Sequence, residues 1–132
     1  MIKGVIAGSF DVLHPGYIDM FSRASSQCDR LTVLLHDDPS IERSYKLKPV
    51  LSILERTNML LALSAVDAIR TYKTEKGLYK ILATSNYDIR FQGVDYKEKP
   101  FTGDDLDIPI IWIPRNHGWS TTKFKKLIAE SL

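Results

Sequence analysis

Apolar runs of strand length alternate along this chain with segments in which apolar residues recur at helical spacing. Residues 2–7 and 31–35 are such runs, and between them apolar side chains return every three or four residues from Tyr17 to Cys28. An apolar run without polar alternation is typical of a parallel strand covered on both faces. The alternation continues with helices over 52–64 and 75–83, strands over 66–69, 88–92 and 110–113, and a last helix from 120–122 packed through Phe124, Leu127 and Ile128. This order predicts an α/β fold with a doubly wound, parallel five-stranded sheet and a ligand site beyond the carboxyl ends of its strands.

The composition fits one globular domain. The chain has 132 residues, of which 44% are hydrophobic, and a formal net charge of +2. We expect a single domain over residues 1–132 that buries about two-thirds of the surface of the unfolded chain. A net charge this small does not indicate a nucleic acid or an acidic membrane as partner. No apolar run approaches the ~20 residues of a membrane span. With no signal peptide and one cysteine, Cys28, we expect a cytoplasmic protein without an internal disulfide and with a buried thiol.

The turn after the first strand carries the most chemistry. It reads Gly8-Ser-Phe-Asp-Val-Leu-His-Pro-Gly-Tyr17 and joins an apolar strand to a helical pattern. The first backbone N–H groups of a helix have no partner within the helix, and the helix dipole adds positive potential there. The turn therefore predicts an anion-binding site, to which His14 adds a proton or a positive charge.

A second motif stands between the last strand and the last helix, and it reads Arg115-Asn-His-Gly-Trp-Ser-Thr-Thr122. Arginine offers a fork of donors for phosphate oxygens, glycine lets a backbone approach closely, and hydroxyls at a helix start accompany free amides. Taken alone, the motif fits an ordinary helix cap equally well. Two helix N-termini suited to binding anions, in one α/β unit, favour a shared phosphate site.

Both motifs resemble those of the small HxGH-type nucleotidyltransferases, which have a Rossmann-like sheet. The first matches the pattern G[ST]FDx[LI]HxGH except at the second histidine, where this chain has Tyr17. The second resembles RTEGISTT, sharing Arg115, Gly118 and 120–122 and differing at Asn116, His117 and Trp119. The resemblance spans nearly the whole chain, and it is greatest for the glycerol-3-phosphate cytidylyltransferase branch.

The resemblance implies nucleotidyl transfer. A phosphate oxygen of an acceptor attacks the α-phosphorus of a nucleoside triphosphate, and pyrophosphate leaves without a covalent enzyme intermediate. Catalysis would rest on positioning and on stabilising charge at the phosphates. A Mg²⁺ ion would bridge the nucleotide phosphates, without a metal site built from protein side chains. The implied nucleotide-binding residues are Gly8, Ser9, Phe10, His14, Gly93, Asp95, Arg115, Ser120 and Thr121.

Further positions carry over from the family, each with a plainer alternative. His14, Tyr17 and Arg115 are joined in the implied catalytic set by Lys46 and Lys48, which otherwise are solvated loop lysines. The second-helix arginine, Arg56, would bind the acceptor phosphate, or it is a surface charge.

Two turn positions are open in the same way. Asp11 would bind the acceptor or shape its turn. The segment 93–95 would flank the nucleotide base or form an ordinary turn after a strand.

Tyr17 is the departure with the largest consequence. A phenol donates a hydrogen bond to a phosphate oxygen but carries no positive charge near neutral pH. Three interpretations are open: weaker stabilisation of the transition state, a structural place at the head of the apolar helical stripe, or compensation by the imidazole of His117.

The sequence thus predicts an enzyme that transfers CMP from CTP to a small phosphorylated alcohol such as glycerol 3-phosphate. The alternatives are an adenylyltransferase that uses ATP and a nucleotide-binding module whose catalysis is impaired by Tyr17. We also expect a homodimer, because residues 59–63 are apolar on every face of their helix and the family is dimeric. The contact would involve this segment or the region around residues 14–17.

Overall fold

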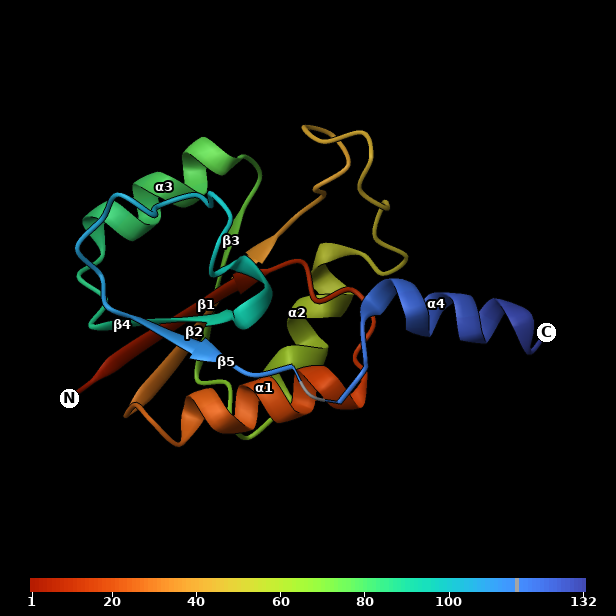
Figure 1. Cartoon of the computed structure of the whole chain (residues 1–132), viewed down its shortest axis with the longest axis horizontal. Coiled ribbons are helices and arrows are strands. Elements are labelled where there is room, and N and C mark those ends of the chain that lie inside the picture. The colour runs from red at the N-terminus through yellow and green to blue at the C-terminus, as the bar shows by residue number, and fades with distance from the viewer. Residues whose placement is uncertain (116) are drawn as a thin grey trace.

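The fold is a five-stranded parallel sheet with helices on both faces (Figure 1). This computed structural model describes residues 1–115 and 117–132, so Asn116 of the second motif lies outside the described residues. The strands are β1 (Lys3–Gly8), β2 (Arg30–His36), β3 (Ala68–Tyr72), β4 (Ile89–Gly93) and β5 (Ile110–Ile113). The helices are α1 (Pro15–Ser25), α2 (Ile53–Leu61), α3 (Glu75–Thr84), a 3₁₀ turn η1 (Val94–Tyr96) and α4 (Thr121–Glu130).

The strand order explains where a ligand would bind. The order is β3-β2-β1-β4-β5, and every neighbouring pair is parallel. The chain winds outward from β1 to β3 and then returns to add β4 on the other side of β1. The predicted doubly wound α/β sheet is confirmed, and its topological switch point lies between β1 and β4. In sheets of this kind the ligand crevice opens at that point, beyond the carboxyl ends of the strands.

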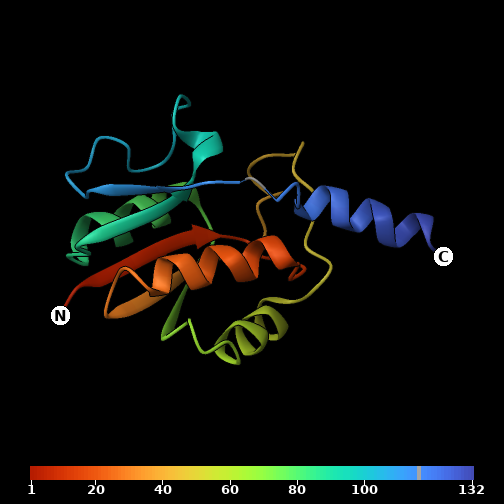
Figure 2. The same cartoon turned by 60° about the horizontal axis from the view of Figure 1, so that its bottom comes forward.

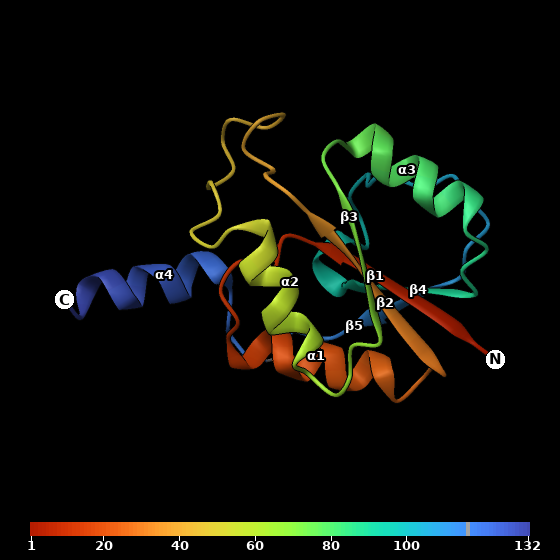
Figure 3. The same ribbon diagram turned by 180° about the vertical axis from the view of Figure 1, so that it is seen from behind.

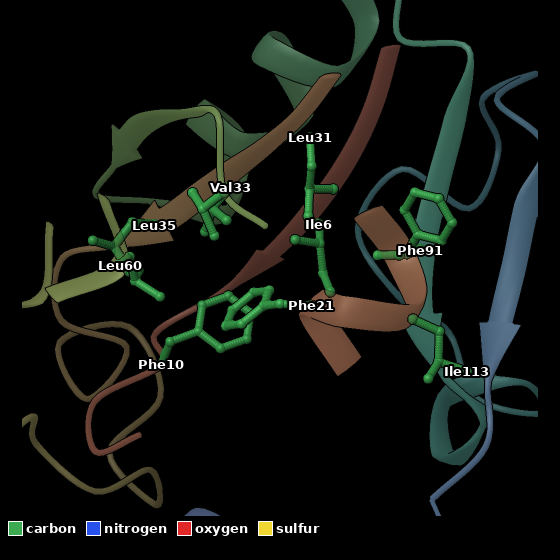
Figure 4. Close-up of a cluster of buried hydrophobic side chains, with 11 residues drawn as sticks. Ile6, Phe10, Phe21, Leu31, Val33, Leu35, Leu60, Phe91 and Ile113 are labelled. Atoms are coloured by element: carbon green, nitrogen blue, oxygen red, sulfur yellow. The ribbon is translucent and has the colours of Figure 1, made fainter. Parts of the chain in front are cut away.

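Alternate residues of the central strands supply two hydrophobic cores. Ile6 of β1 points toward α1 and α2, where it packs with Phe21 and Leu60 (Figure 4). Its neighbour Val5 points the opposite way and packs with Leu78 of α3. The period-two geometry of a strand therefore places α1 and α2 on one face of the sheet and α3 on the other (Figure 3).

One helix start follows its sequence signature. Ser52 caps α2 by accepting the backbone N–H of Glu55 at 3.1 Å, and the Glu55 carboxylate accepts the Ser52 N–H at 2.9 Å. This reciprocal capping box fixes the start of α2 directly after the loop that borders the carboxyl edge of the sheet.

Some element boundaries differ from the sequence-based expectation. Helix α1 ends at Ser25, so Cys28 lies in the following turn and is half-buried. Helix α2 ends at Leu61, and β3 begins at Ala68 rather than at position 66. Helices fray at their ends, where apolar periodicity alone does not show which residues leave the helix.

The largest difference concerns α4, which extends away from the sheet (Figures 1 and 2). Leu127 is 47% exposed and Ile128 is 43% exposed, so the prediction that both pack into the core is wrong. Phe124 does pack inward, against the rings of His14 and Trp119. The first turn of α4 is therefore the part that faces the carboxyl edge of the sheet. Among the described residues, no helix combines the length and apolar character needed to cross a bilayer.

Candidate active site

A cleft of about 750 Å³ opens at the carboxyl ends of β1 and β4. Side chains from both sequence motifs line it, including His14 and Tyr17 from the first and Arg115 and His117 from the second. The predicted nucleotide-binding residues Gly8, Ser9, Phe10, Gly93, Ser120 and Thr121 line the same cleft. The fold therefore brings the two motifs to one site, at the predicted edge of the sheet.

His14 caps the N-terminus of α1 in a defined tautomer. Its Nδ1 accepts the backbone N–H of Gly16 at 3.1 Å, so the ring proton of the neutral imidazole is on Nε2. The residue is 4% exposed, and Nε2 has no hydrogen-bond partner among the described residues. Burial, together with the nearby His117 and Arg115, lowers the pKa of His14. The geometry yields a neutral imidazole whose Nε2–H is unpaired at the wall of the cleft.

Aromatic rings hold this imidazole in place. The Tyr17 ring stacks on His14 with centroids 4.0 Å apart, and the Trp119 ring lies nearly parallel to His14 at 6.0 Å. The Tyr17 hydroxyl is hydrogen-bonded to the hydroxyl of Thr121 at the start of α4. Burial raises the pKa of Tyr17 above its ordinary value. Tyr17 is therefore a neutral link between the two motifs, with its hydroxyl engaged by Thr121.

The turn between β1 and α1 stores backbone strain. Phe10 has a φ of 42°, in the left-handed region that residues with a side chain seldom adopt. Its ring packs in the core at 5.0 Å from both Phe21 and Tyr17. A Cβ on Gly8 would lie 2.8 Å from the Phe10 ring, so only glycine fits there. The ring of Phe10 thus holds the turn, and its expected contact with a nucleotide stays a prediction.

The second motif is anchored by its arginine. Arg115 forms an ion pair with Asp95 and donates to the carbonyl of Trp119 at 2.7 Å. Ser120 caps α4 by accepting the Lys123 N–H at 3.1 Å. In the part of the chain that the structure describes, Asp95 thus contacts Arg115, and its place beside a nucleotide base stays a prediction.

The two loop lysines differ in their position relative to the cleft. Lys46 is half-buried and lines the cleft, whereas Lys48 is exposed and lies outside the cleft lining. The geometry therefore supports a phosphate contact for Lys46 more directly than for Lys48.

Asp11 joins three segments at the rim of the cleft. Its carboxylate accepts the backbone N–H groups of Val50 at 2.7 Å and Leu51 at 2.9 Å, and it pairs with the ammonium of Lys125 on α4. Burial alone would raise the pKa of Asp11, but Lys125 and the two amides outweigh it and lower that pKa. Asp11 shapes the site by fixing the loop before α2 to the first turns of α4. Direct contact with an acceptor stays a prediction.

Arg56 is buried rather than a surface charge, and it is 2% exposed. Its guanidinium donates to the carbonyls of Ser9 at 2.9 Å and His36 at 2.6 Å. It also donates to the carbonyls of Leu51 and Asp37. These bonds tie the ends of β1 and β2 to the start of α2. Arg56 lies outside the cleft lining, so its predicted contact with the acceptor has no geometric basis in this structure.

The far lobe of the cleft, defined by Arg43, Glu75, Arg90 and Thr102, was not anticipated from the sequence. Glu75 pairs with Arg43 at 2.9 Å and accepts from the Thr102 hydroxyl at 2.9 Å. Arg90 is 5% exposed, donates to the Thr102 carbonyl, and has no partner for its Nε among the described residues. Two signals were available in the sequence: a charge within an apolar strand, and an acid at the helix start that follows a strand.

The donor set of the cleft suits phosphates rather than a metal ion held by protein ligands. Within residues 1–115 and 117–132, no group of three or more His, Cys, Asp or Glu residues could hold a metal ion. The nearby carboxylates of Asp11 and Asp95 are already paired with cations. A Mg²⁺ ion held through the phosphates of a bound nucleotide stays a prediction.

Comparisons with known proteins identify a matching family and related sequences. Residues 5–126 match the model of the family described as cytidylyltransferase-like. The chain is 37% identical over 124 residues to the bifunctional protein HldE of Hyphomonas neptunium, covering 90% of this chain and 25% of that protein. It is 30% identical over 124 residues to HldE of Caulobacter vibrioides, covering 90% of this chain and 26% of that protein. The chain thus spans about a quarter of the length of these curated relatives.

A solved structure has a similar fold. The crystal structure of the lipopolysaccharide core biosynthesis protein from Thermoplasma volcanium superposes with a TM-score of 0.66 at 22% sequence identity. The match covers 86% of this chain and 95% of that one. The two motifs, the parallel sheet and the family match agree with the resemblance to HxGH-type nucleotidyltransferases, and the chain belongs to the cytidylyltransferase-like family.

Proposed function

We propose that this protein transfers a nucleotidyl group, CMP from CTP, to a small phosphorylated acceptor and releases pyrophosphate. The observation that carries the proposal is one cleft that holds two helix N-termini and the unpaired Nε2–H of His14. Helix N-termini attract phosphates through their free amides and through the helix dipole. The family assignment supplies the reaction class, and the cleft supplies groups suited to it.

The positions of the lining residues support the following roles in this proposal. His14 donates from Nε2 to an oxygen of the α-phosphate, where charge grows as the acceptor oxygen attacks. The start of α4 and Arg115 hold the β- and γ-phosphates, and Lys46 adds a cation from the facing loop. Bound with the nucleotide, Mg²⁺ would neutralise part of the phosphate charge.

The far lobe favours an acceptor that carries hydroxyl groups. The far lobe contains hydrogen-bond donors on Arg43 and Thr102 and acceptors on Glu75 and Thr102. The Nε–H of Arg90 has no partner among the described residues. Hydroxyls both donate and accept hydrogen bonds, so glycerol 3-phosphate or a sugar phosphate matches this lining. The Thermoplasma volcanium protein of similar fold is a lipopolysaccharide core biosynthesis protein, and we include acceptors used for cell-surface polymers in the proposal.

Two alternatives keep a place. If the protein uses ATP instead of CTP, it is an adenylyltransferase. Discrimination between the two bases would depend on loop and backbone groups. A nucleotide-binding module is the second alternative, because Tyr17 is neutral and bonded to Thr121.

The proposal extends to the setting of the enzyme. We expect residues 1–132 to act as one domain of a cytoplasmic enzyme. A homodimer is supported by apolar side chains on α2 that stay open to solvent, with Met59 at 42%, Leu61 at 50% and Leu54 at 67% exposure. Sedimentation at high micromolar concentration tests it, and a monomer there would contradict it.

The experiment that tests the function is a screen for pyrophosphate release. CTP and ATP are each combined with Mg²⁺ and with glycerol 3-phosphate, hexose and heptose phosphates or no acceptor. We expect release that depends on one acceptor, is faster with CTP, and is lost in the His14→Ala variant. Nucleotide binding without release from any acceptor would favour the binding module. Absence of nucleotide binding would refute both.

A further inference from the structure

Two histidines in the cleft present their rings in the same way. His14 accepts the backbone N–H of Gly16 on Nδ1 at 3.1 Å, and His117 accepts the backbone N–H of Trp119 on Nδ1 at 3.0 Å. In both cases the donor is the residue two positions later in the chain. An imidazole whose Nδ1 accepts a hydrogen bond carries the proton of its neutral form on Nε2. Each motif therefore supplies one imidazole with a donor on Nε2.

The two rings meet at the N-terminus of α1. A Cβ built on Gly16 would lie 2.6 Å from Cε1 of His117 and 2.9 Å from Cε1 of His14. Both Cε1 atoms thus lie against the same point, beside the first amides of α1, and His117 is close enough to help lower the pKa of His14. Both residues line the cleft, His14 buried and His117 half-buried. Only a glycine at position 16 leaves room for this pair.

We propose that His117 is a second catalytic imidazole, which donates from Nε2 to the same phosphate chain as His14. The inference rests on the proposed nucleotidyl transfer and adds a residue to it. Tyr17 does not fill this role, because its hydroxyl is bonded to Thr121 and its ring stacks on His14. His117 instead reaches the helix start from the second motif, directly after β5 and before α4.

The chemistry requires hydrogen bonds, and neither imidazole needs to transfer a proton. A bond forms between an oxygen of the acceptor phosphate and the α-phosphorus, and the bond from that phosphorus to the bridging oxygen breaks. The electron pair leaves with pyrophosphate. His14 and His117 stabilise the negative charge that grows on the non-bridging and leaving oxygens. A single preorganised donor of this kind is worth about 10²–10³-fold in turnover.

Nitrogen-15 NMR of the histidine side chains tests the contact without an acceptor. The chain has three histidines. His36 also borders the cleft, but it is 2% exposed and its Nε2 is already bonded to the Lys73 carbonyl at 3.2 Å, so it serves as the reference for an imidazole that has a partner. The probes are Mg²⁺ with CTP, Mg²⁺ with ATP, and inorganic pyrophosphate. We expect both His14 and His117 to show protonated Nε2 atoms that shift on addition of CTP or pyrophosphate, with little change at His36.

The outcomes separate the inference from the proposed function. A shift at His14 without one at His117 would overturn the second imidazole and leave nucleotidyl transfer standing. If no nucleotide shifts either residue, the proposed function fails as well. A CTP-induced shift at both, with pyrophosphate alone shifting His117, supports a contact with the leaving group.

A double-mutant comparison then tests catalysis with whichever acceptor the screen identifies. We expect His117→Ala to lower kcat about 10²-fold with a smaller change in KM, and His117→Gln, which keeps a donor, to retain more activity. In a Tyr17→His background a new imidazole lies near the same helix start, so the His117→Ala loss should shrink to less than tenfold. Equal losses in the two backgrounds would rule out compensation for Tyr17 and leave His117 as an independent donor. An unchanged kcat in His117→Ala, in a variant with unchanged thermal unfolding, would overturn the proposal.

Discussion

Replacing Arg56 by methionine tests whether this buried arginine holds the walls of the cleft or binds the acceptor. Methionine keeps much of the apolar volume of the side chain but offers no donor. The carbonyls of Ser9, His36, Asp37 and Leu51 then lose the guanidinium that they share. We therefore expect the Arg56→Met variant to lose stability first, and activity only as far as the walls move.

The magnitude follows from the carbonyls that are left without a partner. A buried polar group without a hydrogen bond costs about 1–3 kcal/mol. Only the carbonyl of His36 belongs to a fully buried residue, whereas Ser9, Asp37 and Leu51 are half-buried and partly open to water. We expect the free energy of unfolding to fall by about 3–5 kcal/mol. At about 3–5 °C per kcal/mol for a chain of this length, Tm falls by about 10–20 °C.

Urea unfolding followed by circular dichroism measures the effect, with Arg70→Met as the matched control. Arg70 is exposed and donates to the Ser85 hydroxyl, so its loss should change the free energy of unfolding by about 0.5 kcal/mol or less. The structural role is refuted if Arg56→Met lowers the free energy of unfolding by less than about 1 kcal/mol, as the control does, while it raises the KM for the acceptor tenfold or more. That result would restore the acceptor-binding role suggested by the sequence.

Three further predictions follow from single contacts. Gly16→Ala places a Cβ 2.6 Å from His117 and should lower kcat/KM about 10²-fold. Gly77→Ala, whose Cβ would face the flexible Thr74 hydroxyl at 3.2 Å, should leave activity near normal. Burial lowers the pKa of His14 below 6.5, so as the pH falls the unfolded chain binds a proton at this residue before the folded chain does. The free energy of unfolding should therefore fall between pH 7.5 and pH 5.5, and a free energy that stays constant over this range would contradict the prediction. Burial also raises the pKa of Cys28, so its thiol should react with a disulfide reagent at pH 7.5 at least ~10 times more slowly in the folded chain than in urea.

Much of the fold could be predicted because its signals are local. Uninterrupted apolar runs identify covered parallel strands, and Ser52 with Glu55 marks a helix start that the structure confirms. The convergence of the two motifs follows from topology, since all five strands end at the same edge of the sheet. The prediction for helix α4 is wrong because an apolar stripe indicates a covered face without indicating what covers it. The exposed Leu127 and Ile128 show that the sheet does not cover this face.

The site was harder to predict where its contacts join distant segments. Asp11 and Lys125 are more than a hundred residues apart in sequence, and no spacing rule links them. Arg56 follows a glutamate in a helix, a pattern shared by exposed and buried arginines, so its four carbonyl partners become visible only once β1, β2 and α2 are assembled. The far lobe around Glu75 and Arg90 depends on the loop before β5, whose path has no periodic signature.

The most direct test of the central claim, that this cleft holds a nucleoside triphosphate for attack, is a crystal structure with CTP and Mg²⁺. We expect the phosphates to lie between the N-termini of α1 and α4, with His14 Nε2 within about 3 Å of an α-phosphate oxygen. The Arg115 side chain should face the β- and γ-phosphates, and the far lobe should stay free for the acceptor. A nucleotide bound elsewhere on the surface, or phosphates that avoid His14, would contradict the account.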